Sequence, residues 1–179
     1  DIRGHAHIGS YLAALERSTG RTFADYRALW QWSVDDLPAF WGSVWRHFGL
    51  GADVADADVL TDRSMPGARW LPGVELNFAE RALRGPATDP FDRGTDALVS
   101  VSQSRDVVRR SRGELWDEVA RVQAGLRRLG VGRGDRVVAY LPNISETVVA
   151  FLATAALGAV WASCAPEFGV RSVVDRFVQ

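Results

Sequence analysis

The second half of the sequence repeats one order of elements, in which a helical pattern ends at a glycine and an apolar run follows. The clearest case is GVGRGDRVVAYLPN, residues 130–143. It follows a helix predicted by apolar residues on one face, namely Leu115, Val119, Val122, Leu126 and Leu129. Glycines that bind a dinucleotide pyrophosphate lie in the opposite order, after a strand and before a helix. We therefore interpret these glycines as a helix end at Gly130 and a tight turn before a buried strand, RVVAYL, which argues against a dinucleotide oxidoreductase.

The elements on either side of this stretch extend the same order. ALVSV (97–101) and VVRR (107–110) predict a β-hairpin, and Ser111 with Glu114 forms a capping box for the helix that follows. Asn143 and Glu146 resemble a second capping box, and Gly158 would end that helix before the buried strand AVWASC (159–164). The last helical pattern consists of Val170, Val173, Val174, Phe177 and Val178. Strands that alternate with helices predict an α/β fold with a parallel sheet.

The first half of the sequence is helical and rich in aromatic residues. One helix is predicted by the spacing of Leu37, Phe40, Trp41, Val44, Trp45 and Phe48. Ser33 would be its N-cap and Gly49 its C′ residue. A shorter helix from Phe23 to Gln31 would place Tyr26 and Trp30 on its inner side. An aromatic stripe at helical spacing is typical of a structural core, and nothing in it indicates stacking on a cofactor or a base.

Three regions follow from this pattern. Residues 1–83 form a helical, aromatic-rich region, residues 84–97 (RGPATDPFDRGTDA) form a linker, and residues 98–179 form an α/β portion. The start lacks Met and any signal-peptide pattern, and the end falls inside an apolar periodic segment. We expect the chain to be a piece of a longer protein, whose remainder completes the fold.

Composition excludes several classes of partner and site. The 21 basic residues are all arginine and balance 22 acidic residues, so no net field favours nucleic acid or an anionic membrane. The longest apolar stretch, residues 148–162, is too short for a membrane span. Cys164 is the single cysteine, which argues against a disulfide scaffold and indicates a cytoplasmic protein.

Candidate catalytic and metal-binding residues are few. His5 and His7 alternate, but no third ligand is evident, so we assign no metal site. His47 is expected at a helix C-terminus, and Cys164 lacks a neighbouring histidine base that would make it a nucleophile. The aspartates of the first half fall on turns or first helical turns, which suits capping: Asp25, Asp35, Asp36, Asp53, Asp56 and Asp58. We assign no catalytic residue.

Four stretches resemble the N-terminal part of an acyl-CoA synthetase of the acyl-adenylate-forming superfamily. They are LWQWSVDDLPAFWGSVWRHF (29–48), ARWLPGVELNFAERAL (68–83), GVGRGDRVVAYLPN (130–143) and WASCAPEFGVRSVVDRF (161–177). The first two resemble short-chain acyl-CoA synthetases. The SCAPEFG segment of the fourth stretch is most similar to the acetoacetyl-CoA synthetase family. Acetyl-CoA synthetases carry a glycine-rich FGGFSPE-like segment at this position instead.

The resemblance implies an incomplete part of the large N-terminal domain of an adenylate-forming enzyme. Such a ligase uses MgATP to convert a carboxylate, here acetoacetate, to an acyl-adenylate, and CoA then displaces AMP. The family's phosphate-binding loop and its two lysines would lie beyond Gln179, because this chain has no lysine. We therefore expect the chain by itself to be inactive and to bind neither ATP, Mg²⁺ nor CoA alone.

One edge of the predicted sheet is a candidate ligand site. In open α/β sheets ligands bind beyond the carboxyl ends of the strands, and SCAPEFG lies where AVWASC ends. Ser163, Cys164 and Ala165 are small, so CoA or a short acid could pass close to the backbone. The alternative is a turn that only packs, with Pro166 ending the strand and Glu167 at a helix N-terminus.

Two other functions stay open from the sequence. The parent could activate acetate or propionate, as other short-chain acyl-CoA synthetases do. A short non-catalytic interaction module with a partial synthetase fold would instead present an exposed apolar sheet edge or helix face. The coding sequence downstream of Gln179 would discriminate an enzyme from such a module.

Overall fold

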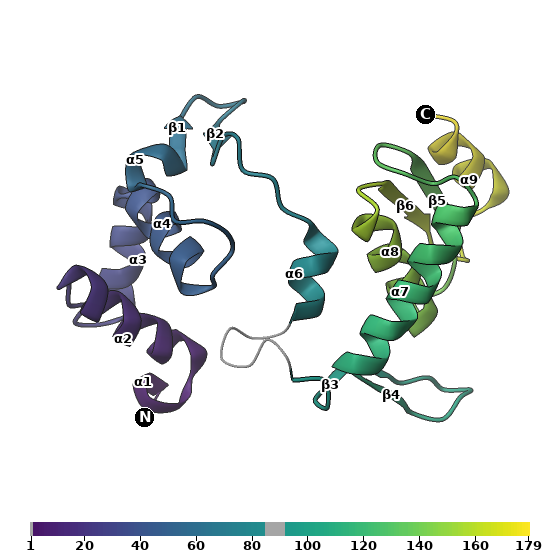
Figure 1. The fold of residues 1–179 in the computed structure, drawn as a ribbon, viewed down its shortest axis with the longest axis horizontal. Coiled ribbons are helices and arrows are strands. Elements are labelled where there is room, and N and C mark those ends of the chain that lie inside the picture. Colours follow the sequence, from purple (N-terminus) through teal and green to yellow (C-terminus); the bar gives the residue numbers. More distant parts are fainter. Residues whose placement is uncertain (1, 85–91) are drawn as a thin grey trace. The chain divides into compact units, whose positions relative to one another are not determined.

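The computed structural model describes residues 2–84 and 92–179. The chain divides into two compact units, Asp1–Leu76 and Asn77–Gln179, which we call the N-terminal unit and the C-terminal unit (Figure 1). Half of the predicted linker, residues 85–91, lies outside the described residues. The predicted limits of the three regions therefore stay predictions.

The N-terminal unit is mainly helical. Its elements are α1 (Ile2–His5), α2 (His7–Thr19), α3 (Tyr26–Asp35), α4 (Leu37–His47), α5 (Asp56–Val59) and the short antiparallel strands β1 (Leu60–Asp62) and β2 (Arg69–Trp70). The core joins α2, α3 and the segment between them through Tyr11, Leu15, Phe23, Leu29 and Trp32. Aromatic rings meet mostly edge to face in this core: the centroids of Trp32 and Phe40 lie 5.7 Å apart at 80°. The predicted aromatic core of this half is therefore present.

The helix-start predictions for this half need correction. Ser33 is not an N-cap, because it lies inside α3, where its hydroxyl donates to the carbonyl of Trp30 at 2.7 Å. Asp36 caps α4 instead and accepts from the amide of Ala39. A single residue separates α3 from α4, so the last turn of α3 occupies the position where a cap was expected. Gly49 has φ +56° directly after the α4 C-cap, which confirms its predicted C′ role.

The predicted inner side of α3 is also wrong. Tyr26 and Trp30 are 69% and 49% exposed, whereas Leu29 and Trp32 are buried. The helix begins at Tyr26, with Asp25 as its N-cap, and runs to Asp35. The face that packs is set by α2 and α4 rather than by the size of the aromatic side chains. In the α4 stripe, Trp45 is buried while Trp41 and Phe48 remain exposed.

The C-terminal unit follows the predicted α/β order. Its elements are α6 (Phe78–Arg84), β3 (Asp96–Ser100), β4 (Val108–Ser111), α7 (Arg112–Arg128), β5 (Arg136–Tyr140), α8 (Ser145–Ala156), β6 (Val160–Cys164) and α9 (Val170–Phe177). β3 and β4 form an antiparallel pair, and β5 and β6 form a parallel pair. The core lies among α6, α7 and α8 and consists of Ala79, Leu83, Leu115, Val119, Val149, Leu152 and Ala153. The predicted hairpin and the parallel pairing are therefore confirmed.

Local signals at helix ends in this unit are largely confirmed. Ser111 and Glu114 form the predicted capping box at the start of α7. Gly130 has φ +89°, and the amide of Val131 donates to the carbonyl of Leu126 at 3.0 Å, as in a Schellman ending. Gly158 ends α8 in the same way, with φ +70°. The glycines of residues 130–134 are thus a helix end and a turn.

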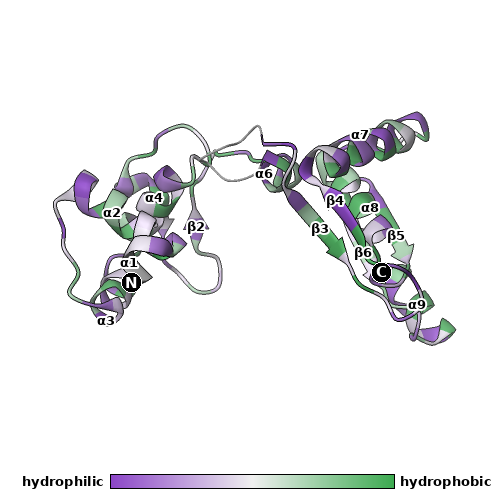
Figure 2. Ribbon diagram, turned by 90° about the horizontal axis from the view of Figure 1, so that it is seen from below, coloured by the Kyte–Doolittle hydropathy of each residue, from purple (hydrophilic) through white to green (hydrophobic). Residues whose placement is uncertain are grey.

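Two expectations for this unit are wrong. Asn143 does not cap α8, whose N-cap is Ile144 without a side-chain cap bond. The strands β5 and β6 are not buried on both faces in this chain: Val138 is 52% and Val160 54% exposed. Figure 2 shows hydrophobic residues along these strands. The two-stranded sheet packs against α8, and its remaining apolar side chains stay uncovered.

Partial burial also marks the predicted face of α7. Leu115 and Val119 lie in the core and Leu126 packs against it, whereas Val122 and Leu129 are exposed. α9 forms as predicted, but none of its residues is buried.

Among the described residues, no helix combines the length and apolar character needed to cross a bilayer.

Candidate functional site

The carboxyl edge of the β5–β6 pair brings together two segments that are more than twenty residues apart in sequence. Tyr140 and Cys164 form the last residue pair of the parallel register. Past this pair, the amide of Leu141 donates to the carbonyl of Cys164 at 3.2 Å. The segment Ala165–Gly169, which we call the edge turn, then leads from β6 to α9. Ligands bind at such carboxyl edges in open α/β sheets.

The three predicted site residues lie at this edge. Ser163 is exposed, Cys164 is buried with 3% of its surface accessible, and Ala165 is half-buried. Successive side chains of a strand point to opposite faces, so Ser163 and Cys164 do not share one. A molecule at the edge could contact the Ser163 side chain and the nearby backbone, while the Cys164 thiol faces the interior.

Two side chains that the sequence reasoning missed contact the edge turn. The Tyr140 hydroxyl lies 2.6 Å from the carbonyl oxygen of Pro166 and 2.8 Å from that of Phe168. The Arg176 guanidinium lies 5.5 Å from the ring centroid of Phe168, in cation–π contact. A polar-tipped aromatic residue at the end of an apolar strand was the available signal for Tyr140. For Arg176 the signal was a position two turns into a helix that follows the turn.

Residues considered as metal ligands or bases do not assemble into a site. His5 ends α1 and His7 begins α2, and His47 ends α4 with its ring 5.2 Å from that of Tyr11. Within residues 2–84 and 92–179, no group of three or more histidine, cysteine, aspartate or glutamate side chains could hold a metal ion. The described part of the chain thus offers no set of ligands for Mg²⁺.

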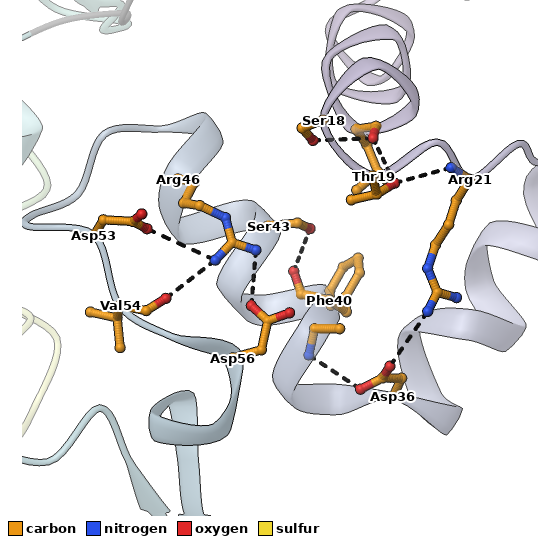
Figure 3. Close-up of polar contacts among 12 residues, drawn as sticks. Ser18, Thr19, Arg21, Asp36, Phe40, Ser43, Arg46, Asp53, Val54 and Asp56 are labelled. Carbon is orange, nitrogen blue, oxygen red and sulfur yellow. Dashed lines mark hydrogen bonds and ion pairs between the residues drawn. The ribbon is translucent and has the colours of Figure 1, made fainter.

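The aspartates of the N-terminal unit have structural partners. Asp25 and Asp36 cap α3 and α4, as predicted, whereas the prediction was wrong for Asp35, which is the last residue of α3 and accepts from the side-chain amide of Gln31 at 2.9 Å. Figure 3 shows Arg46 of α4 reaching the start of α5, where its guanidinium donates to Asp56 at 2.9 Å, and the segment before it, where it donates to the carbonyl of Val54 at 3.2 Å. Arg46 therefore ties two helices together, and we assign this cluster no chemistry.

The groups whose pKa values are shifted also lie away from the edge turn. Accepted hydrogen bonds lower the pKa of Glu114, through the amide and then the hydroxyl of Ser111. The amide and hydroxyl of Ser64 lower that of Asp62 in the same way. Burial raises the pKa of Tyr11, against a smaller opposing effect of its hydrogen bond with Ser43. These groups support capping, a turn and core packing.

Comparison with known proteins relates both parts of the chain to one group of enzymes. A family model described as AMP-binding enzyme matches residues 91–177. A second, described as acetyl-coenzyme A synthetase N-terminus, matches residues 26–82. The two matched segments cover most of the chain.

Several of the similar proteins are acetoacetyl-CoA synthetases. Acetoacetyl-coenzyme A synthetase of Rhizobium meliloti is 41% identical over 160 residues, which are 89% of this chain and 24% of that protein. Acetoacetyl-CoA synthetase of Danio rerio is 36% identical over 182 residues, covering 100% of this chain and 26% of that protein. The solved acetoacetyl-CoA synthetase from Streptomyces lividans superposes with a TM-score of 0.86 at 46% identity, over 98% of this chain and 27% of that one. The chain thus spans about a quarter of the length of the relatives it matches.

Proposed function

This chain is a member of the acyl-CoA synthetase family, homologous to the N-terminal part of acetoacetyl-CoA synthetases, and we propose that its parent protein is an AMP-forming acetoacetate–CoA ligase. The observation that carries this proposal is the structural match to the Streptomyces lividans enzyme, at 46% identity over 98% of the chain. The SCAPEFG segment lies within the matched region, and its resemblance to this family favours acetoacetate.

The proposed reaction has two steps. A carboxylate oxygen of acetoacetate attacks the α-phosphorus of ATP, forming the acyl-adenylate and releasing pyrophosphate. The CoA thiol, losing its proton, then attacks the acyl carbonyl carbon, and the bond to AMP breaks. Both steps depend on positioning and on neutralising charge on phosphate oxygens.

Within this reaction we assign the edge of β6 to the acyl or CoA side. Ser163 and Ala165 present small side chains at a carboxyl strand edge, beside the backbone of the buried Cys164, which suits a short acid or the narrow thiol-bearing arm of CoA. ATP is a substrate of the parent, with Mg²⁺ accompanying its phosphates. Because the described residues do not fit a Mg²⁺ site, no residue of this chain receives a metal-binding role. We place the parent in the cytoplasm, since a single buried free cysteine suits a reducing compartment.

Steady-state kinetics of the full-length parent test the reaction and its substrate. We expect AMP formation that requires acetoacetate, ATP and CoA together, with a higher kcat/KM for acetoacetate than for acetate or propionate. A preference for acetate or propionate would assign the protein to another short-chain acyl-CoA synthetase. We also expect the 179-residue chain alone to catalyse no acetoacetate-dependent exchange of pyrophosphate into ATP, and measurable exchange would contradict this.

A bulky substitution tests the assignment of the β6 edge. Ser163→Trp in the parent, at the exposed side chain of this edge, should raise the KM for acetoacetate or CoA while the KM for ATP changes less than twofold. The matched control is Val101→Trp, which adds the same ring at a residue of the hairpin that is 77% exposed. Equal losses for all three substrates, together with a lower Tm, would show that the residue only packs.

A non-catalytic role makes a different prediction. A module that binds a partner through exposed apolar strands would bind without any turnover by the parent. Full-length protein lacking every acid-dependent activity, yet folded by circular dichroism, would favour this alternative.

A further inference from the structure

The edge turn has few hydrogen bonds of its own. One backbone bond closes it, from the amide of Phe168 to the carbonyl of Ala165 at 3.1 Å. The parallel ladder with β5 ends at the carbonyl of Cys164. The helical hydrogen bonds of α9 begin at the carbonyl of Gly169, which accepts from the amide of Val173. Between these two points the backbone position depends on contacts from outside the turn.

Tyr140 supplies the main polar contact of this kind. Its hydroxyl oxygen lies 2.6 Å from the carbonyl oxygen of Pro166 and 2.8 Å from that of Phe168, which fits a shared hydrogen bond donated by the hydroxyl. The backbone of Tyr140 is itself fixed by pairing opposite Cys164. A side chain anchored in the sheet thus holds two carbonyls of a segment that has left the sheet.

A second contact restrains the same turn. Arg176, on α9, lies over the ring of Phe168 at 5.5 Å from its centroid. This contact involves a side chain of the turn, whereas Tyr140 holds its backbone. The placement of the backbone that follows Cys164 and Ala165 is therefore controlled chiefly by the Tyr140 hydroxyl.

We propose that Tyr140 is a positioning residue of the ligase, because its hydroxyl holds the edge turn against the acyl or CoA side of the cleft. The inference rests on the proposed function for the place of the turn in the reaction. Tyr140 acts through the turn and takes no part in bond making. Its loss should weaken the binding of the substrate that meets the turn and leave the phosphate chemistry largely unchanged.

Tyr140→Phe in the full-length parent tests this role. The substitution removes the hydroxyl and keeps the ring, so we expect the KM for acetoacetate or CoA to rise about fivefold, the effect of one lost hydrogen bond. The kcat and the KM for ATP should change less than twofold. Tyr26→Phe, the same chemical change at an exposed tyrosine of the N-terminal unit, is the matched control.

A thiol measurement tests the contact without turnover. Cys164 is the single cysteine of this chain and adjoins the turn, so its reaction rate with a disulfide reagent reports on release of the turn. In the full-length parent, with the labelling of Cys164 followed by mass spectrometry of its peptide, we expect Tyr140→Phe to react about fivefold faster than the unmodified protein, and Tyr26→Phe within twofold of it.

The possible results separate the proposals. Thiol rates and KM values for Tyr140→Phe within twofold of those for Tyr26→Phe would overturn the positioning role. Equal rises in all three KM values with a lower Tm would overturn it too, by showing a merely structural bond. If the unmodified parent joins no short acid to CoA, the proposed function fails, and the positioning role of Tyr140 in that reaction fails with it. The thiol rates would then still establish whether Tyr140 holds the turn.

Discussion

The cores of the two compact units consist of different kinds of side chain, and the structure of one unit was easier to predict from its sequence than that of the other. The N-terminal unit packs aromatic rings among short helices, with Tyr11, Phe23 and Trp32 in its core. The C-terminal unit packs aliphatic side chains of three helices, including Val119 and Leu152. Its helix ends were predicted largely correctly, whereas the N-terminal unit required corrections at helix starts and at buried faces.

The difference teaches where local signals suffice. A glycine after a helix or a capping box uses atoms within a few residues, so the structure that it forms depends little on the rest of the chain. A tryptophan can lie inside or outside with its helix unchanged, because the neighbouring elements decide which face is covered. Aromatic-rich helical regions are therefore harder to interpret than alternating α/β regions.

The largest expected effect comes from the two cores. Leu152→Ala and Leu15→Ala should each reduce the free energy of unfolding by about 2–5 kcal/mol, because each removes a buried side chain and leaves a cavity. Since the two cores share no residue, amide hydrogen exchange should speed up mainly in the unit that carries the substitution. Equal loss of protection in both units would contradict the comparison.

A smaller effect is expected at matched glycines, one in each unit. Gly158 and Gly20 both end helices with similar positive φ, +70° and +68°. A Cβ at Gly158 would lie 3.3 Å from Cγ of Arg133, whereas one at Gly20 would meet nothing within 4 Å. We expect Gly158→Ala to cost about 2 kcal/mol and Gly20→Ala about 1 kcal/mol in thermal denaturation. Equal costs would mean that backbone strain alone determines both.

Within the N-terminal unit, removing a true helix cap should reduce the free energy of unfolding more than removing a residue that was wrongly predicted to be a cap. Asp36→Ala removes the cap of α4 and should cost about 1 kcal/mol in chemical denaturation, whereas Ser33→Ala should stay within about 0.5 kcal/mol. A larger loss for Ser33→Ala than for Asp36→Ala would restore the original interpretation of Ser33.

The smallest effect concerns acid pH. The pKa values of Glu114 and Asp62 are lowered by accepted hydrogen bonds, so each carboxylate contributes stability above its unfolded pKa. That contribution is lost as pH falls through the folded pKa, below the ordinary carboxyl range. The stability advantage of the unmodified chain over Glu114→Gln or Asp62→Asn should therefore shrink in acid. Denaturation between pH 7 and pH 3 checks this, and an advantage that grows toward pH 3 would contradict it.

The candidate site was predicted in part. The sequence placed Ser163, Cys164 and Ala165 at a strand end, and the structure has them there, although their role is still a proposal. The sequence marks Tyr140 only as a polar-tipped aromatic residue at a strand end, and its contact with the edge turn was missed because it joins residues 26 and 28 positions apart. The cap predicted at Asn143 failed for a local reason, because α8 begins at Ser145, after an extended Ile144.

Sequence by itself determined the order of elements, the helix ends at Gly49, Gly130 and Gly158, and the capping box at Ser111. Each of these rests on hydrogen bonds between near neighbours in the chain. Tertiary structure alone decided that Leu29 and Trp32 pack inside while Tyr26 and Trp30 do not, that Val138 stays exposed, and that Tyr140 contacts the edge turn. Burial and long-range hydrogen bonds depend on which surfaces meet in space, and spacing along one helix or strand does not specify its neighbour.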